Sequence, residues 1–303
     1  MSAGRVGKKR SFTLFLAALP FVIFVLMFSY VPLFGWIYSF FNYKPALRLD
    51  QMNFVGFDNF AKLYSDRHTV LQVMKNTLAM SFLNLLTAPL PMIGAILLNE
   101  IKNGKFRKFI QTATTLPNFI SWIVVFSLSY AMFSTSGGFV YTIMKQLGLE
   151  IPVIGLMGNA DWAWIFQLLL GIWKTLGWSM IIYIAAIAGI DGELYEAARI
   201  DGANRFRLAV HITLPNLAPT FFVLLLLQIS NLLNNGFDQY FVFYNSLVSE
   251  KLNVLDYYVY SAAFRTNDYS YATVLGMLKS IISLILLFSV NRLSKKLRGQ
   301  SLV

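Results

Sequence analysis

Long stretches without charged residues constrain this chain more than any other feature. Residues 11 to 43, 76 to 99, 109 to 144 and 208 to 237 contain no Asp, Glu, Lys or Arg. Two further apolar stretches, 162 to 190 and 269 to 291, each carry a single charge, Lys174 and Lys279. A helix needs about 20 predominantly apolar residues to cross a bilayer, and each stretch is long enough. The sequence therefore predicts an all-α, polytopic membrane protein with six transmembrane helices.

The composition agrees with that prediction and excludes several chemistries. Hydrophobic residues make up 57% of the 303 positions and charged residues 13%, whereas soluble domains are about a quarter charged. The chain has no cysteine, which excludes disulfides, thiolate metal sites and thiol nucleophiles. Its two histidines, His68 and His211, fall on opposite sides of the predicted membrane. We expect no catalytic residues and no metal site.

The distribution of basic residues predicts the orientation. If the N-terminus is inside, most of the 25 Lys and Arg residues fall in inside segments, as the positive-inside rule requires. Both termini are then cytoplasmic, and the first hydrophobic helix is expected to be uncleaved. The net charge of +11 is explained by this topology and by lipid headgroups, with no nucleic-acid partner. We expect one transmembrane domain over residues 1–303, multi-pass in a bacterial plasma membrane.

The helix boundaries follow from the apolar stretches and their breakers. The predicted spans are residues 12–40, 71–98, 109–133, 161–188, 215–234 and 269–291. Two further segments lie outside on this topology. Residues 42 to 70 suggest an amphipathic helix at the interface, with a headgroup-anchored loop as the alternative. The glycine-rich region 134 to 160 is a candidate for a short re-entrant or surface helix.

The inside segment 189–214, between the fourth and fifth helices, combines charge with folding signals. Asp191 and Gly192 form a turn, and Glu193–Ile200 contains helix formers with an acid in the first turn. Gly202 supplies a turn, and a second short helix is expected over Asn204–Ile212. The segment predicts a compact two-helix protrusion. An ordinary amphipathic connection with solvated charges is the alternative.

Residues 196–215, EAARIDGANRFRLAVHITLP, resemble the cytoplasmic loop of importer-type ABC permeases along their full length. The resemblance extends over the chain to carbohydrate-uptake permeases of the maltose-transporter type, through FVGFDNF, GGFVYTIMKQLGL and GIWKTLGWSMIIYIAAIAGIDGELYEAARIDGA. The stretch NNGFDQYFVFYNSLVSEKLNVLDYYVY is similar to the subgroup associated with polysaccharide fragments.

This resemblance implies a fold, a set of partners and a set of coupling residues. The fold would be that of a type I ABC importer permease. The partners would be a second homologous permease subunit forming a heterodimer, two ATPase subunits and an extracytoplasmic sugar-binding protein, all at the lipid bilayer. Its coupling helix would dock into the ATPase. The residues that it implies for this coupling are Glu196, Ala197, Ala198, Asp201 and Gly202.

ATP chemistry is assigned to a partner and not to this chain. None of Lys105, Lys174 and Lys279 lies in a phosphate-binding loop of the type Gly, four residues, Gly-Lys-Ser/Thr. We therefore expect a transport subunit that is not an enzyme and binds no cofactor, with ATP and Mg held by the partner ATPase.

Polar and aromatic residues inside the spans are candidates for contacts with the transported solute. Intramembrane lysines are costly, so Lys279 and Lys174 should face a cavity, a helix carbonyl or a partner chain. Amide and carboxylate groups can satisfy sugar hydroxyls, and aromatic faces can cover pyranose rings. Interhelical hydrogen bonding, packing and interfacial anchoring are the alternatives. The remaining candidates are Gln228, Asn231, Asn234, Asn235, Asp238, Trp173 and Trp122.

The sequence thus predicts the permease subunit of an ATP-driven, binding-protein-dependent importer of oligosaccharides or polysaccharide fragments, working by alternating access. An importer of amino acids, peptides or phosphate esters is the alternative, because the coupling segment does not select the cargo. A membrane-embedded enzyme is disfavoured, since no nucleophile with a base and no paired intramembrane carboxylates are visible. A channel or secondary transporter would leave the coupling segment without a purpose.

Overall fold

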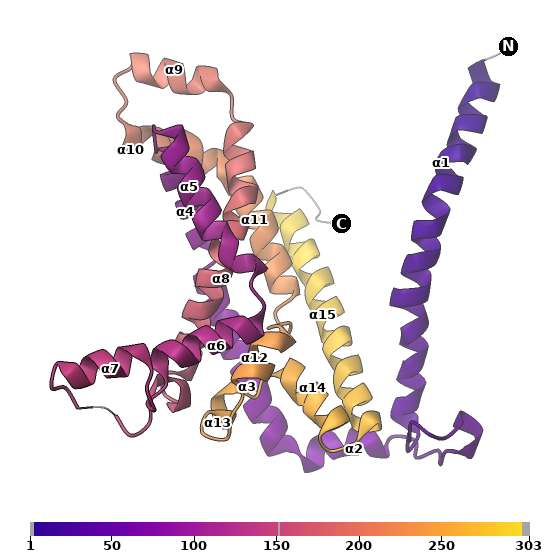
Figure 1. The fold of residues 1–303 in the computed structure, drawn as a ribbon. Coiled ribbons are helices and arrows are strands. Elements are labelled where there is room, and N and C mark those ends of the chain that lie inside the picture. Colours follow the sequence, from indigo (N-terminus) through magenta and orange to yellow (C-terminus); the bar gives the residue numbers. More distant parts are fainter. Residues whose placement is uncertain (1–2, 151, 299–303) are drawn as a thin grey trace. The chain divides into compact units, whose positions relative to one another are not determined.

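The computed structural model describes residues 3–150 and 152–298, and these residues are almost entirely helical (Figure 1). Their only extended pairing is an isolated antiparallel bridge between Phe41 and Phe54. The helices, with short 3₁₀ or π turns written as η, are α1 (Ala3–Val25), η1 (Leu26–Tyr30), η2 (Val31–Phe40), η3 (Leu49–Gln51), α2 (Asp58–Ser65), α3 (Arg67–Leu86), α4 (Pro89–Asn99), α5 (Gly104–Thr115), η4 (Leu116–Phe119), α6 (Trp122–Phe133), α7 (Phe139–Gln146), η5 (Leu156–Gly158), α8 (Ala163–Ala188), α9 (Gly192–Ile200), α10 (Arg205–Leu208), η6 (Ala209–Thr213), α11 (Leu214–Ser230), α12 (Phe237–Phe243), α13 (Ser249–Leu252), α14 (Leu255–Phe264) and α15 (Tyr269–Arg298).

The helices long and apolar enough to cross a membrane match the predicted spans. Among the described residues there are five, and a bent helix pair gives up to six. The five are Leu14–Phe40, Arg67–Asn99, Ala163–Ala188, Arg205–Ser230 and Tyr269–Arg292. The prediction of an all-α, polytopic membrane protein is confirmed. Which side of the membrane each terminus occupies stays a prediction.

The third span, predicted as one helix over 109–133, is broken. Its two parts, Gly104–Phe119 and Trp122–Phe133, meet at a bend of 104°. Pro117 lacks the N–H that would continue the first part, and Ser121 starts the second part by accepting a hydrogen bond from the Val124 N–H at 3.4 Å. The proline that was expected within a continuous helix therefore ends one helix before the next begins.

Both ends of the predicted fifth span also differ from the structure. The helix expected over Asn204–Ile212 is not separate, because α10 continues through the π turn η6 into α11 and forms one span, Arg205–Ser230. Pro215 follows this turn at the start of α11, where the missing N–H of a proline is tolerated. At the other end the helix ends at Ser230 and not at residue 234. Asn231 explains this end, since its side chain donates to the Leu227 carbonyl at 3.0 Å and competes with the helical backbone.

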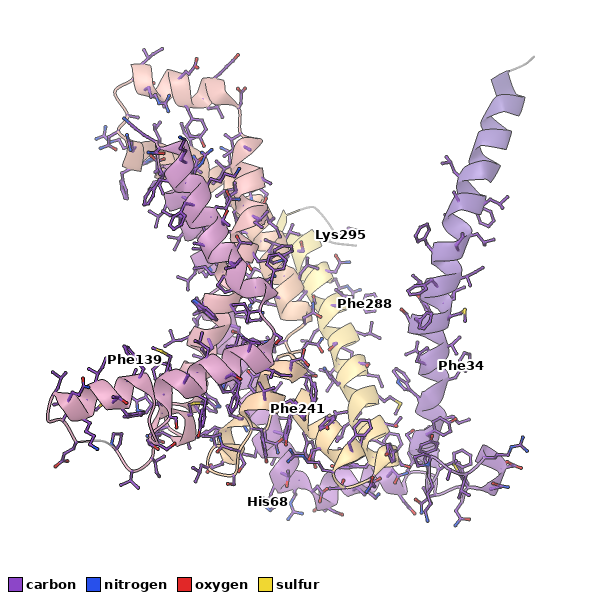
Figure 2. All side chains as sticks on the ribbon, in the orientation of Figure 1. Phe34, His68, Phe139, Phe241, Phe288 and Lys295 are labelled. Carbon is purple, nitrogen blue, oxygen red and sulfur yellow. The ribbon has the colours of Figure 1, made fainter. Side chains whose placement is uncertain are left out.

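The described chain divides into two compact units. The first comprises the chain up to Arg67 together with Val259–Lys279. Two alternatives were predicted for the region 42 to 70, a helix and a loop, and α2 shows a helix over its part Asp58–Ser65. The Asn59 amide of α2 donates to the carbonyls of Ser39 and Phe41 at 2.9 and 3.1 Å. The Lys62 ammonium pairs with the Asp268 carboxylate at 2.5 Å. Figure 2 shows Phe34 projecting from the first span, where its side chain is 79% exposed, as expected for a lipid-facing or partner-facing surface.

The second unit comprises His68–Tyr258 and the chain from Ser280 on. Its core lies where α4, α8 and α11 meet, and side chains from all three helices are buried there. The α6 and α7 helices leave this core as an arm at a steep angle to α5 (Figure 1), and Figure 2 shows Phe139 on that arm. The buried core side chains are Met92, Ala95, Leu98, Met180, Tyr183, Ile187 and Leu217.

A glycine allows α8 to approach the end of α5. A Cβ atom on Gly177 would lie 2.2 Å from the carbonyl carbon and oxygen of Thr114 and 2.6 Å from the Thr115 nitrogen. These neighbours are backbone atoms, which cannot rotate away as a side chain would. Close packing of α8 against the break in the third span therefore requires glycine at this position.

We predict that Gly177→Ala destabilises the protein by about 1–3 kcal/mol, because the added methyl overpacks the helix contact. The measurement is the thermal unfolding midpoint of the purified protein in detergent. Gly171→Ala is the matched control, since it lies on the same helix and its Cβ would meet open space. Equal midpoints for the two variants would contradict the proposed close packing.

Candidate functional site: a polar and aromatic cavity beside the core

A cavity of about 630 Å³ opens beside the core of the second unit. Its wall combines residues of α3, α4, α6, α8, α11 and α12, so it is formed where several spans meet and not on one loop. Cavities between the helices of a bundle are common solute sites in membrane proteins. This position makes it the candidate site for the transported solute.

The wall of the cavity mixes amide, carboxylate and aromatic groups. Four of the residues singled out in the sequence lie on it, namely Gln228, Asn235, Asp238 and Trp122. They are joined by further residues of the same chemical types: Asn84, Gln239, Trp178, Tyr183, Phe221 and Phe237. Such a wall can exchange hydrogen bonds with hydroxyl groups and cover apolar ring faces, which suits a polyhydroxylated molecule.

The turn after α11 positions two of these residues. The Asp256 carboxylate accepts hydrogen bonds from the backbone N–H groups of Asn235 and Gly236 at 3.0 and 3.1 Å. Gly236 has φ of +87°, a left-handed conformation that favours glycine. The Asn235 amide then donates to Ser81 Oγ on α3 at 3.0 Å. The turn is thus fixed from two sides.

The helix after the turn is held by buried groups. The Gln239 amide of α12 donates to the backbone and side-chain oxygens of Gln167 on α8 at 2.9 and 2.8 Å. Next to Gln239, Tyr240 is only 1% exposed. Burial raises the pKa of the Tyr240 phenol, and the nearby Asp256 carboxylate raises this pKa further. Tyr240 therefore stays neutral at ordinary pH and contributes packing instead of charge.

Lys174 and Trp173 lie outside the wall of the cavity. The Lys174 ammonium donates to the carbonyls of Pro117, Asn118 and Ile120 at 3.3, 2.8 and 2.5 Å. This arrangement matches the alternative in which an intramembrane lysine bonds to helix carbonyls. Trp173 is 42% exposed on α8 and does not line the cavity.

Three further sequence candidates also lie elsewhere. Asn231 and Asn234 are exposed in the turn after α11, and the Asn234 amide donates to Asn231 Oδ1 at 3.2 Å. Lys279 is half-buried on α15, in the first unit. A contact between any of these three residues and a solute stays a prediction.

The coupling segment forms the short helix that its sequence predicts. In Figure 1, α9 lies beyond the end of α8 and across its direction. Asp191 begins α9 by accepting the Glu193 N–H at 3.0 Å. At its other end the Gly202 N–H donates to the Arg199 carbonyl and the Ala203 N–H to the Ala198 carbonyl, at 3.1 and 2.9 Å. This is a Schellman ending, and it requires the positive φ of Gly202, +78°.

The predicted coupling residues lie on the surface of this segment. Glu196, Ala197, Asp201 and Gly202 are exposed, and Ala198 is half-buried. Glu196 also lines a second hollow, of about 820 Å³, together with Arg199, Arg205, Arg107 and Lys102. Tyr195 fastens α9 to the following span through a 3.0 Å hydrogen bond between its hydroxyl and that of Thr213.

Sequence reasoning missed several residues that form or support the cavity. Asn84 and Tyr183 line it from within apolar helices, and a polar group in an otherwise apolar run was the available signal. Asp256 and Ser81 could not be found this way, because they act on a turn that is distant from them in the sequence. Among the described residues, no three metal-ligating side chains gather into a group.

The chain belongs to the family of binding-protein-dependent transport system inner membrane components, whose model matches residues 89–299. This defines it as a multi-pass membrane permease of ABC transport systems and not an enzyme. The matched residues include the break in the third span, the coupling segment and most of the cavity wall, but not its residues Asn84, Thr87 and Ala88.

Particular relatives are similar over nearly the whole chain. The polygalacturonan/rhamnogalacturonan transport system permease protein YteP of Bacillus subtilis (strain 168) is 39% identical, over 93% of this chain and 88% of that protein. Protein LplB of the same strain is 37% identical, over 97% and 92%. A chain of a bacterial alginate ABC transporter, solved in complex with an alginate pentasaccharide-bound periplasmic protein, superposes with a TM-score of 0.84 at 31% identity, covering 97% of both chains.

We predict that Asp256→Ala loosens the turn after α11. Two backbone N–H groups, one half-buried and one exposed, would lose their acceptor, which costs about 0.5–1.5 kcal/mol for each hydrogen bond. Hydrogen exchange at the amides of Asn235 and Gly236 should then become faster by about tenfold or more. Glu250→Ala is the matched acidic control. Unchanged exchange in Asp256→Ala would show that the carboxylate does not hold the turn.

Proposed function

We propose that this chain is the permease subunit of an ATP-driven, binding-protein-dependent importer of oligosaccharides or polysaccharide fragments. The observation that carries the proposal is the cavity wall, where Gln228, Asn235 and Asp238 lie among aromatic rings at the meeting point of the spans. The cavity is the part of the solute pathway that this chain contributes. Transport alternates the side of the membrane to which the pathway opens.

The cargo is inferred from the wall and from the relatives. Sugars present hydroxyl groups around a ring with apolar faces. When a sugar displaces water from the cavity, its hydroxyls can hydrogen-bond to the amides of the wall, so that removing these amides from water costs less free energy. The names of similar proteins refer to polygalacturonan, rhamnogalacturonan and arabinooligosaccharides. The superposed structure comes from an alginate importer. Together these observations favour carbohydrate over amino acids, peptides or phosphate esters.

Energy comes from a partner ATPase that docks on the coupling segment. Side chains of Ile200 and Phe206, on either side of Gly202, are 86% and 75% exposed. Large exposed apolar side chains on this polar segment and at the first turn of the next span offer a contact surface for another protein. Two ATPase subunits, which hold ATP and Mg, a second homologous permease and an extracytoplasmic sugar-binding protein complete the assembly. The coupling segment and both termini then face the cytoplasm of a bacterial cell, inside its plasma membrane.

The fold gives a direct route from the docked segment to the cavity. The α9 helix follows α8 after a short turn and is tied by Tyr195 to Thr213, which lies just before α11 in the next span. Both α8 and α11 contribute to the cavity wall. Movement of α9 with the ATPase therefore displaces two walls of the cavity at once.

We predict that Glu196→Ala and Gly202→Ala uncouple transport without preventing insertion into the membrane. Alanine at position 202 meets a left-handed backbone conformation, which costs about 1–2 kcal/mol and distorts the end of α9. Sugar-stimulated ATP hydrolysis by the reconstituted complex should fall to the sugar-independent rate. Gly104→Ala is the control glycine, since its Cβ would meet open space. Normal stimulation in both variants would refute docking through α9.

We also predict that Gln228→Leu weakens sugar uptake through this cavity. Loss of one buried hydrogen-bonding group costs about 1–3 kcal/mol, which corresponds to a rise in KM of about 5- to 150-fold. Leu227→Met, on an exposed position next to it, should keep the KM of the unmodified complex. The measurement is uptake of labelled oligosaccharide into proteoliposomes. A wild-type KM in Gln228→Leu would remove this residue from the pathway.

A further inference from the structure

The break in the third span leaves backbone carbonyls without their helical donors. Pro117 has no N–H, and the chain turns through 104° before α6 begins. Carbonyl groups at membrane depth need a partner from within the protein, because no water is available in the hydrocarbon core. The structure provides that partner from α8.

One side chain meets three carbonyls at the break, of which the Pro117 carbonyl also accepts the Ile120 N–H at 3.1 Å. The Lys174 ammonium has three N–H donors, and it has three acceptors, the carbonyl oxygens of Pro117, Asn118 and Ile120. The side chain is only 8% exposed. The number of N–H donors on the ammonium therefore equals the number of carbonyl acceptors that the break presents to it.

The same lysine lies next to an aromatic wall of the cavity. Its nitrogen is 5.6 Å from the centre of the Trp122 ring, within the range of a cation–π interaction. Trp122 is the first residue of α6 and lines the cavity, whereas Lys174 does not. The lysine is thus placed to fix the direction of α6 and, through it, the position of Trp122.

We propose that Lys174 is a positioning residue for solute passage: it fixes the break between α5 and α6 and thereby holds Trp122 against the cavity. This inference rests on the proposed role of the cavity in sugar transport. Lys174 acts through the backbone and Trp122 and makes no contact with the sugar. Removing the Lys174 side chain therefore changes the position of Trp122 and the shape of the cavity, while the chemical groups of the wall stay the same.

The absence of cysteine allows the bend to be measured directly. Thr112→Cys and Ser127→Cys place spin labels on exposed positions on either side of the break in the intact transporter complex. Fifteen residues of straight helix would span about 22 Å, and the bend brings the two sites closer. We expect a narrow distribution of short distances in the otherwise unmodified chain. In Lys174→Met it should broaden toward the straight-helix value, with Lys174→Gln between the two.

Uptake kinetics separate positioning from simple stability. Lys174→Met should raise the KM for oligosaccharide by about tenfold at normal complex yield, and Trp122→Leu should raise the KM similarly while keeping the short distance. Leu169→Met, exposed on α8, is the control and should change neither quantity.

An unchanged distance in Lys174→Met and Lys174→Gln would overturn the proposal, as would a changed distance with unchanged KM. If the unmodified complex transported no oligosaccharide, the proposed function would fail, while the distances would still test the role of Lys174 at the bend.

Discussion

The three hydrogen bonds between the Lys174 ammonium and the carbonyls at the end of η4 are the interaction on which, in our proposal, the break in the third span depends. A membrane-spanning chain can change direction sharply only where its free backbone groups find partners. Because α8 supplies such a partner, the third span can stop and restart at a right angle. The cavity exists beside this turn, since α6 leaves the bundle there instead of continuing through it.

The α8 helix connects the main parts of the molecule. Its Gly177 admits the end of α5, its Met180 and Tyr183 join the core with α4 and α11, and Tyr183 also lines the cavity. Its last turn leads directly to the coupling segment. One helix therefore carries the packing, part of the candidate solute site and the link to the proposed ATPase contact. On the proposed mechanism, a force applied at α9 passes through the short turn after α8 and then along α8 to the cavity.

Much of this architecture can be predicted from the sequence, because the thickness of the hydrocarbon core sets the length of the apolar segments that cross it. Runs without charge located five spans, with shifted ends for the fifth, and both parts of the broken third span, and Asp191 and Gly202 located both ends of α9. The break at Pro117 was missed, because prolines are tolerated within transmembrane helices when neighbours satisfy the freed groups. Whether the helix continues past a proline depends on a partner such as Lys174, which lies 57 residues further along the chain.

The candidate solute site shows the same limit of prediction from sequence. Gln228, Asn235 and Asp238 were found because polar residues stand out near the end of an apolar span, and the structure brings them to one cavity. Asn231 and Asn234 have the same sequence signal but lie in the exposed turn, since that span ends earlier than its apolar pattern suggests. Asp256 carries no signal of its own, because its effect appears only when the turn folds against it.

The central claim is that oligosaccharide passes through the cavity between α4, α8 and α11. The most direct measurement is thiol labelling of Ser179→Cys, a cavity position in a chain that otherwise has no cysteine. In the assembled importer, transported oligosaccharide delivered by its binding protein should slow the labelling of this cysteine. Labelling at the same rate with and without sugar, in a complex that transports normally, would contradict the account.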